Sequence, residues 1–380
     1  MDRPPIRDGG VIWRGGRIVR VGRRADILSR PVRIAADAPD AILMPGLINA
    51  HAHLELSRLA GKIPRLPFTD WLARIAAARR TLTGADIRRG IREGEQRLLA
   101  LGVTSVVDIA SFQAARETPR TLRTRVLHEI VGLRNPVRIP RKTAVSPHAP
   151  YSLSDSNLDR VARWWDRRPY AFVSMHIAES NAENCFFKSG TGPFKSFYAR
   201  MGLSPRPSPG RRVVAHLDGR RLLRRGLLAV HVNDIRPAEA RLLTARGVAV
   251  AVCPGSLAFF GFPRSGVRRL IEAGAAILFG TDSLASNGDL NLFAELRRAR
   301  AYWRLPPERI IRSATQAPGR WIWDGRAGRI AAGAYADFIL VGARTRMADP
   351  FSDLLSGHAE RRIRLRVVGG KIFGLTRFCP

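Results

Sequence analysis

The chain has 380 residues, 45% hydrophobic and 25% charged, a composition that allows a large core and excludes a disordered protein. No apolar run is long enough to span a membrane, and the first ten residues lack the apolar stretch of a signal peptide, so we expect a cytoplasmic protein. The three cysteines lie far apart, which excludes a disulfide framework and a Cys-x-x-Cys metal knuckle.

The formal net charge of +33 resembles that of a nucleic-acid-binding protein. However, nearly all of the basic residues are arginines, and pairs such as Arg23–Arg24, Arg167–Arg168 and Arg297–Arg298 recur along the whole chain. A binding face would concentrate these residues in one region. We therefore attribute the charge to a composition bias and expect no nucleic-acid partner.

The first predicted element is a hairpin in residues 9–22, where "GGVIWRGGRIVRVG" alternates apolar and polar residues around Gly-Gly. A similar pattern returns in residues 328–342 and 362–374. The two ends of the chain therefore predict strands of one small β-sandwich, with the middle of the chain inserted into it. The predicted division is residues 1–44 and 328–380 for the β-sandwich and residues 45–327 for the inserted domain.

The middle of the chain alternates short apolar runs with helix-like stretches such as residues 86–101 and 236–247. The eight runs are residues 41–53, 102–110, 124–133, 142–150, 171–179, 227–234, 247–254 and 275–283. Strands that alternate with helices form a parallel sheet, and eight units match a (β/α)8 TIM barrel, which usually has about 250 residues. We therefore predict an α/β fold of this kind, in which the third unit leaves little room for a helix.

Polar residues gather at the predicted carboxyl ends of these strands, where a TIM barrel carries its active site. His51 and His53 end the first strand, and their i, i+2 spacing places both imidazoles on the same face. The other strand-end residues are His148, His176, Glu179, His231 and Asp282. Imidazoles together with a carboxylate suit Zn²⁺ or Fe²⁺ and suit Mg²⁺ or Ca²⁺ poorly. The sequence therefore predicts a metal site with one ion.

Several of these residues also have simpler interpretations. Glu179 alone would be read as an acidic residue in the first turn of a helix. Trp71, in "LPFTDWLARI", either stacks on a heterocyclic substrate or packs its own helix, and Glu55 either contacts substrate or caps a helix. We expect Ser286 and Asn287 to brace the loop after the eighth strand.

Five motifs occur in the same order as in a known family. They are "PGLINAHAHLE" (45–55), "SPHAPYS" (146–152), "HIAES" (176–180), "AVHVND" (229–234) and "GTDSLASN" (280–287). With these motifs the chain resembles the amidohydrolase superfamily, in particular its cytosine deaminase and triazine hydrolase-like (chlorohydrolase) branch. That branch includes deaminases of S-adenosylhomocysteine, methylthioadenosine and aminodeoxyfutalosine. Residues 255–266 depart from the family's usual pattern after the seventh strand, a region that often shapes the substrate pocket.

The resemblance assigns roles to these positions. The metal ligands that it implies are His51, His53, His176 and Asp282. It also implies that Glu179 shuttles a proton, that His231 contacts water or substrate, and that His148 faces the substrate. Lys142 opens the fourth strand instead of ending it, so the carbamylated lysine of a dinuclear relative is missing and one metal ion, Zn²⁺ in preference to Fe²⁺, is expected.

The resemblance further implies a metal-dependent hydrolase of non-peptide C–N bonds. The specific prediction is a deaminase that releases ammonia from a heterocyclic amine, either an adenine-type nucleoside or aminodeoxyfutalosine. A cyclic-amide or halide (chlorotriazine-type) hydrolase is the alternative within the class, and a non-catalytic structural or regulatory relative is the alternative outside it. A nucleic-acid-editing deaminase is excluded, because such enzymes carry Pro-Cys-x-x-Cys after His-x-Glu, whereas here Cys253 precedes Pro254 and no second cysteine follows nearby. We expect a small-molecule substrate and no membrane partner, and we leave homo-oligomerisation open.

In this chemistry the metal lowers the pKa of the attacking water to about 7. Asp282 then takes a proton from that water, Glu179 passes a proton to the ring nitrogen, and His231 orients the nucleophile. Such acid–base assistance typically contributes about 10²–10⁴-fold in rate.

Overall fold

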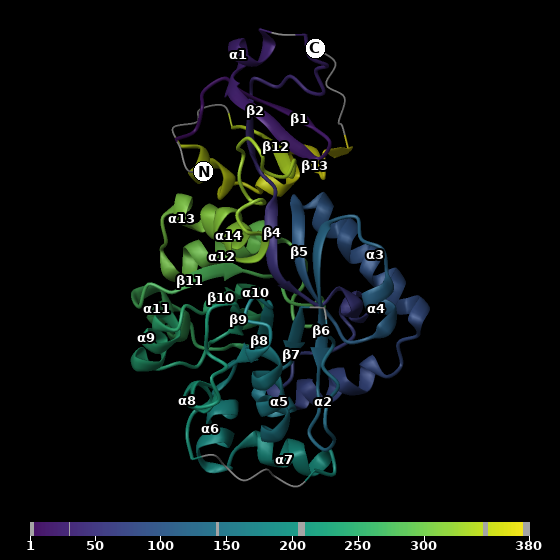
Figure 1. Cartoon of the computed structure of the whole chain (residues 1–380), viewed down its shortest axis with the longest axis vertical. Helices are drawn as coiled ribbons and strands as arrows, with labels where there is room; N and C mark the ends of the chain where they lie inside the picture. Colours follow the sequence, from purple (N-terminus) through teal and green to yellow (C-terminus); the bar gives the residue numbers. More distant parts are fainter. Residues whose placement is uncertain (1–3, 30, 142–143, 204–209, 345–348, 375–380) are drawn as a thin grey trace.

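The computed structural model describes residues 4–29, 31–141, 144–203, 210–344 and 349–374. A large α/β domain carries a smaller β domain at one end, and both chain termini lie in or beside the smaller domain (Figure 1). Within the described ranges, no helix is both long enough and apolar enough to cross a membrane.

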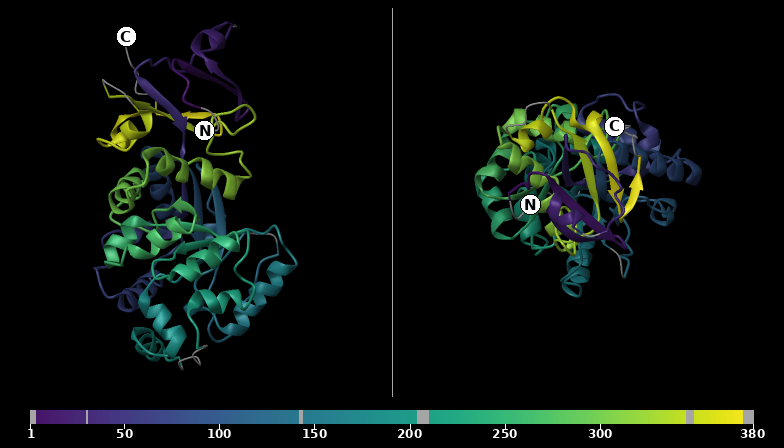
Figure 2. Two further views of the ribbon diagram at one scale, coloured as in Figure 1. Left: turned by 90° about the vertical axis from the view of Figure 1, so that its left-hand side faces the viewer. Right: turned by 90° about the horizontal axis from the view of Figure 1, so that it is seen from above.

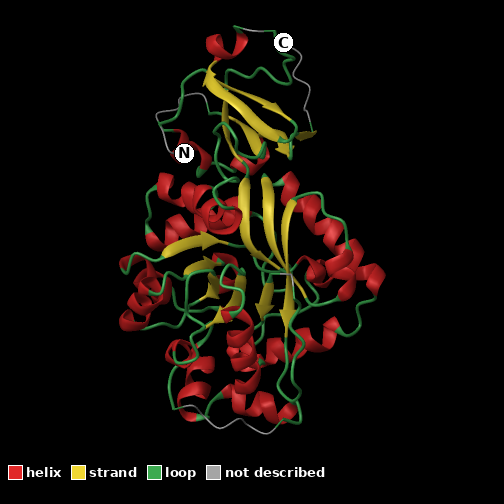
Figure 3. Cartoon of the chain, viewed as in Figure 1, coloured by secondary structure: helices red, strands yellow, loops and turns green. Residues whose placement is uncertain are grey.

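Eight parallel strands form the centre of the large domain, and neighbours in the chain are neighbours in the sheet (Figure 3). They are β4 (Leu47–Ala52), β5 (Val103–Ala110), β6 (Arg123–Ile130), β7 (Val145–Pro147), β8 (Val173–Ile177), β9 (Leu227–His231), β10 (Ala249–Val252) and β11 (Ala276–Phe279). A bridge between Ala52 and Asp282 joins the first strand to the end of the last. The N–H groups of Thr281 and Asp282 also donate to the carbonyl of His51, at 3.1 and 3.0 Å. These contacts close the sheet and confirm the predicted TIM barrel.

Helices surround this barrel. They are α2 (Phe68–Arg79), α3 (Gly84–Ala100), α4 (Gln113–Glu117), α5 (Asp155–Asp166), α6 (Asn181–Ser189), α7 (Pro193–Arg200), α8 (Val213–Asp218), α9 (Pro237–Ala245), α10 (Pro254–Phe260), α11 (Ser265–Glu272), α12 (Leu292–Trp303), α13 (Pro307–Ser313) and α14 (Gln316–Trp323), with 3-10 turns η1 (Leu54–Leu59) and η2 (Pro150–Ser152). The helices predicted in residues 86–101 and 236–247 are α3 and α9. Helix α3 begins at a capping box between Thr83 and Asp86 and buries Ile87, Ile91 and Leu98 on one face. Between β6 and β7 the described residues contain no helix, as expected for the short third unit.

Both ends of the chain build the smaller domain, seen from two further sides in Figure 2. Its sheet has the order β14 (Lys371–Phe373), β13 (Ile363–Val368), β12 (Phe338–Gly342), β3 (Ala41–Pro45), and a hairpin of β1 (Gly9–Arg14) and β2 (Arg17–Arg23) lies against it. Short helices α1 (Arg24–Leu28), α15 (Pro350–Leu354) and η3 (Ala359–Arg362) complete it. The indole N–H of Trp13 donates to the carbonyl of Gly370 at 3.0 Å, which confirms that the two ends pack together.

The first predicted strand, residues 41–53, is divided in the structure. Its first half is β3 of the smaller domain and its second half is β4 of the barrel. At the junction, the N–H of Gly46 donates to the carbonyl of Asp337, and a Cβ at this glycine would lie 2.2 Å from the side chain of Thr104. A continuous apolar run gives no sign of such a change of sheet, because both halves are apolar, although β3 is only partly buried and β4 is wholly buried. The domain boundaries at residues 44/45 and 327/328 stay predictions.

Candidate metal centre and active site

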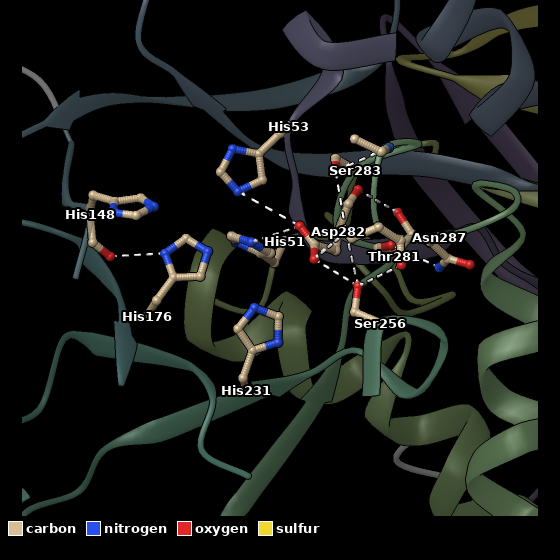
Figure 4. A network of polar contacts seen from close by, with 12 residues as sticks. His51, His53, His148, His176, His231, Ser256, Thr281, Asp282, Ser283 and Asn287 are labelled. Carbon is tan, nitrogen blue, oxygen red and sulfur yellow. Dashed lines mark hydrogen bonds and ion pairs between the residues drawn. The ribbon is translucent and has the colours of Figure 1, made fainter. Parts of the chain in front are cut away.

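Three histidines converge at the carboxyl end of the barrel (Figure 4). His51 lies in β4, His53 follows the end of β4, and His176 lies in β8. One ring nitrogen from each lies within 4.8 Å of the others, and all three residues are buried. Both ring nitrogens of His51 lack a hydrogen-bond partner among the described residues. Buried polar atoms almost always have a partner, so the donor set fits a metal ion that these nitrogens would bind.

Asp282, just after β11, turns its two carboxylate oxygens in different directions. Its Oδ1 lies 3.7 Å from Nε2 of His51 and 3.8 Å from Nε2 of His53. Its Oδ2 accepts hydrogen bonds from the hydroxyls of Ser256, at 2.7 Å, and Ser286, at 2.8 Å. The free oxygen therefore faces the histidines, and together they form a donor set of imidazoles and one carboxylate, typical of Zn²⁺ and Fe²⁺ sites.

The orientation of His176 is set by a backbone contact. Its Nδ1 lies 2.8 Å from the carbonyl of His148, so Nδ1 carries the proton and Nε2 keeps its lone pair. Burial, together with the charges of His148 and His51, lowers the pKa of His176 well below its usual value. Burial also lowers the pKa of His53 to about 3. These imidazoles are therefore neutral near pH 7, which is the form that binds metal.

Glu179 and His231 lie beside the three histidines. Nε2 of His231 is 3.5 Å from Oε1 of Glu179, and the ring centroids of His231 and His176 are 5.2 Å apart. Burial raises the pKa of Glu179 well above its usual value, and the negative charge of Asp282 adds to this. Burial lowers the pKa of His231 to about 4. A carboxyl group with a raised pKa next to a neutral imidazole is suited to general acid catalysis.

The backbone is strained where these side chains leave their strands. Ala178, His231, Val232 and Asp282 all have positive φ angles, between 50° and 69°. Positive φ is uncommon for residues other than glycine, and such strain concentrates at functional sites. The strand ends that carry the proposed chemistry are thus held in place by the surrounding structure.

The three residues predicted to contact substrate have different surroundings in the structure. His148 is adjacent to it, with its ring centroid 4.8 Å from that of His176 and its Nδ1 2.9 Å from the hydroxyl of Ser152. Trp71 is buried on α2, where its ring packs against Phe260 at 5.2 Å. Glu55 accepts hydrogen bonds from two backbone N–H groups after β5, at 2.9 and 3.3 Å. Contact of these residues with substrate stays a prediction.

Sequence analysis did not identify a charged cluster next to the centre. Nη2 of Arg79, on α2, lies 3.1 Å from Oε2 of Glu129 in β6 and 3.5 Å from Oε1 of Glu55, and Ser111 bonds to both Arg79 and Glu129. Burial by itself would raise the pKa of Glu129, but the positive charge of Arg79 opposes it and the pKa falls to about 2. Burial raises the pKa of Glu55 to about 7. The only signal in the sequence was the position of Glu129 near a strand end.

Ser256, which bonds to Asp282, was also not identified from the sequence, because a serine after the seventh strand gives no indication of its hydrogen-bond partner. As expected, Asn287 braces the loop after β11, since its side-chain amide donates to the carbonyl of Thr281 at 2.9 Å. Lys142, which sequence analysis placed at the wrong end of the fourth strand to bridge two metal ions, lies outside the described residues.

Comparison with known proteins agrees with this geometry. The model of the amidohydrolase family matches residues 42–372, which include every residue of the centre. The chain belongs to the amidohydrolase family.

This amidohydrolase is similar to several deaminases. It is 27% identical to a 5-methylthioadenosine/S-adenosylhomocysteine deaminase of Nitratidesulfovibrio vulgaris, over 99% of this chain and 90% of the relative. Among solved structures it is similar to an adenosine deaminase from Xanthomonas campestris with bound zinc, with a TM-score of 0.81 and 27% identity over 97% of this chain and 89% of the other. It also shares its fold with the aminofutalosine deaminase of Helicobacter pylori, with a TM-score of 0.79 and 22% identity over 96% and 95% of the two chains.

Proposed function

We propose that this amidohydrolase is a metal-dependent deaminase that hydrolyses the amino group of an adenine-type nucleoside and releases ammonia. The observation that carries the proposal is the convergence of three buried imidazoles, one free oxygen of Asp282 and the buried carboxyl group of Glu179. The names of the relatives, which are deaminases of adenine nucleosides, support this substrate class.

His51, His53, His176 and Asp282 would hold the ion. When bound, a divalent cation supplies positive charge that lowers the pKa of water to about 7 in favourable sites. We favour Zn²⁺, because of the donor set and the zinc in the related adenosine deaminase. Fe²⁺ suits the same ligands.

The protein residues would divide the proton transfers among them. Asp282 accepts a proton from the attacking water through Oδ1, since Oδ2 is occupied by Ser256 and Ser286. Glu179, whose pKa is raised by burial, donates a proton to the ring nitrogen next to the reacting carbon. His231 holds the incoming oxygen beside Glu179. The proton taken up by Asp282 then leaves with the amino group as ammonia, and the proton that remains on the added oxygen returns to Glu179, so that the carbonyl product forms and both carboxyl groups regain their starting states.

The structure contains a cavity of about 560 Å³ that is lined by Glu129 and by the connection between β6 and β7, including Arg134. Glu129 also interacts electrostatically with His148 and His53 of the candidate site. We propose that the sugar and its 5′ substituent extend into this cavity.

The test is an ammonia-release screen with zinc-loaded enzyme. Its substrates are adenosine, 5′-deoxyadenosine, methylthioadenosine, S-adenosylhomocysteine and aminodeoxyfutalosine, with free adenine and cytosine for comparison. Ammonia from at least one nucleoside, at a rate that falls on chelation, is expected. Chloride release from a chlorotriazine without ammonia from any amine would instead indicate a halide hydrolase.

A further inference from the structure

The position of Glu179 depends on its backbone. Its carboxylate lies 3.5 Å from His231, and within the described parts of the chain no side chain or backbone group makes a hydrogen bond to it. The residue sits between Ala178, which has a φ of 50°, and Ser180, the N-cap of α6. The partners of the backbone N–H and carbonyl of Glu179 therefore also determine the direction of its carboxyl group.

Two buried side chains hold these peptide groups from opposite directions. Oε2 of Glu183, in the first turn of α6, accepts the N–H of Glu179 at 2.9 Å. The side-chain amide of Asn233, just after β9, donates to the carbonyl of Glu179 at 3.1 Å. Glu183 has no solvent-exposed surface and Asn233 is 4% exposed. Both backbone groups of Glu179 are thus satisfied by side chains from different elements.

The same two loops are joined at neighbouring positions. The N–H of Asp234 donates to the carbonyl of Ala178 at 2.9 Å, and the N–H of Val232 donates to the carbonyl of Ile177 at 3.1 Å. Because His231 ends β9, directly before the second loop, these bonds set the position of Glu179 relative to His231. Contacts between the ends of β8 and β9 therefore align Glu179 and His231 beside the metal centre.

We propose that Glu183 and Asn233 are positioning residues that hold Glu179 in the orientation needed for proton transfer. The proposal rests on the proposed function in one respect, the role of Glu179 as proton donor. Neither residue touches the reacting atoms, and both act through the backbone of Glu179.

A role limited to starting α6 does not account for Glu183. Acids at this helical position are usually solvated, and Asp86 in α3, which accepts the N–H of Thr83 at 3.0 Å, is only partly buried. Glu183 is instead wholly buried, and its Oε1 has no partner among the described residues. Burial of a carboxyl group with one unpaired oxygen costs free energy. We interpret this cost as a sign that the position of the side chain matters. Burial raises the pKa of Glu183 to about 8, so the side chain is neutral near pH 7 and glutamine resembles it closely.

The experiment compares four variants on the substrate identified by the screen. Glu183→Ala and Asn233→Ala remove one bond each, Glu183→Gln keeps an acceptor, and Asp86→Ala removes the equivalent bond at a remote helix. Glu183→Ala and Asn233→Ala are expected to lower kcat by about 10- to 100-fold, the effect of a small displacement of a catalytic group, with KM and zinc content near wild type. Glu183→Gln should stay close to wild type, and Asp86→Ala should change only thermal stability.

Glu179→Gln separates this inference from the proposed function. If Glu179→Gln keeps full activity, the proposed proton transfer is wrong. If it loses activity while Glu183→Ala and Asn233→Ala keep theirs, the proposed function stands and the positioning role is wrong. Glu183→Ala should lower kcat no further in the Glu179→Gln background, because both changes remove the same step.

A structural readout does not require turnover or a correct choice of substrate. In the crystal structure of zinc-loaded Asn233→Ala or Glu183→Ala, we expect the carboxylate of Glu179 to lie well beyond 3.5 Å from His231, its separation in the unaltered chain. An unmoved Glu179 in both variants would overturn the proposal. If Glu183→Ala does not fold, Asn233→Ala and Asn233→Asp, which keeps the size but loses the donor, decide the question.

Discussion

The hydroxyl of Ser256 donates to Oδ2 of Asp282 at 2.7 Å, and this bond, together with the one from Ser286, leaves Oδ1 facing the histidines. Ser256 comes from the start of α10 and Asp282 from the end of β11, so the contact links two neighbouring barrel units. Removing partners that orient metal ligands typically costs about 10- to 100-fold in metal affinity. We expect a loss of this order for Ser256→Ala in competition with a chromophoric zinc chelator. Ser189→Ala, an exposed serine on α6, is the control; equal affinity in the two variants would contradict the role of Ser256.

The metal content of purified protein tests the ligand set directly. About one equivalent of Zn²⁺ or Fe²⁺ per chain is expected, because the three imidazoles form a single cluster and Oδ1 of Asp282 faces two of them. His51→Ala and His176→Ala should each lose most of it in elemental analysis. His216→Ala is the matched control, since this buried histidine bonds to Asp155 away from the centre. A full equivalent in both ligand variants would remove His51 and His176 from the set.

Glu179→Gln should separate catalysis from metal binding. Glutamine keeps the size of the side chain but cannot carry the proton, so kcat should fall by about 10²–10⁴-fold. Metal content should stay near wild type, because Glu179 lies outside the proposed ligand set. Asp282→Asn should lose both metal and activity. Elemental analysis and steady-state kinetics on the same preparations distinguish the two roles, and an active Glu179→Gln enzyme would leave this glutamate only a structural part.

Arg79→Ala is expected to destabilise the fold strongly. It leaves the carboxyl groups of Glu129 and Glu55 buried without their cation, and breaking a buried ion pair typically costs about 3 kcal/mol or more. The free energy of unfolding in urea measures this. Arg89→Ala removes an exposed i, i+4 pair with Glu93 and should change little. Similar stabilities of the two variants would show that the buried cluster contributes no more than a surface pair.

Glu129 should make the folded protein sensitive to acid. Its pKa is lowered from 4.5 to about 2, burial being outweighed by Arg79, so the folded state favours the ionised form. Its contribution to stability is therefore complete above pH 4.5 and is lost as the pH falls through about 2. Glu129→Gln should flatten the fall in unfolding free energy over this range, measured by urea titration at each pH. An unchanged acid slope would show that Glu129 does not titrate in this way.

The order of elements and the main site residues could be predicted from the sequence because their signals are local. Alternation of apolar strands with helices requires a parallel sheet, and the carboxyl ends of such strands meet on one rim. His51, His53, His176 and Asp282 could therefore be grouped without coordinates. The pairing of the two chain ends was similarly visible in the matching strand patterns of residues 9–22 and 362–374.

Only the tertiary structure decided which partners these residues have. The division of residues 41–53 at Gly46 depends on contacts with Asp337 and Thr104, which are distant in the chain. Likewise, the bond from Ser256 to Asp282 and the one from Asn233 to Glu179 join separate barrel units. Hydrogen bonds and buried ion pairs depend on the distance between atoms in space, which residue type and spacing along the chain do not specify. The sequence by itself thus determined the fold and the residues that converge at one end of the barrel, and the packing of the barrel decided how each one is oriented.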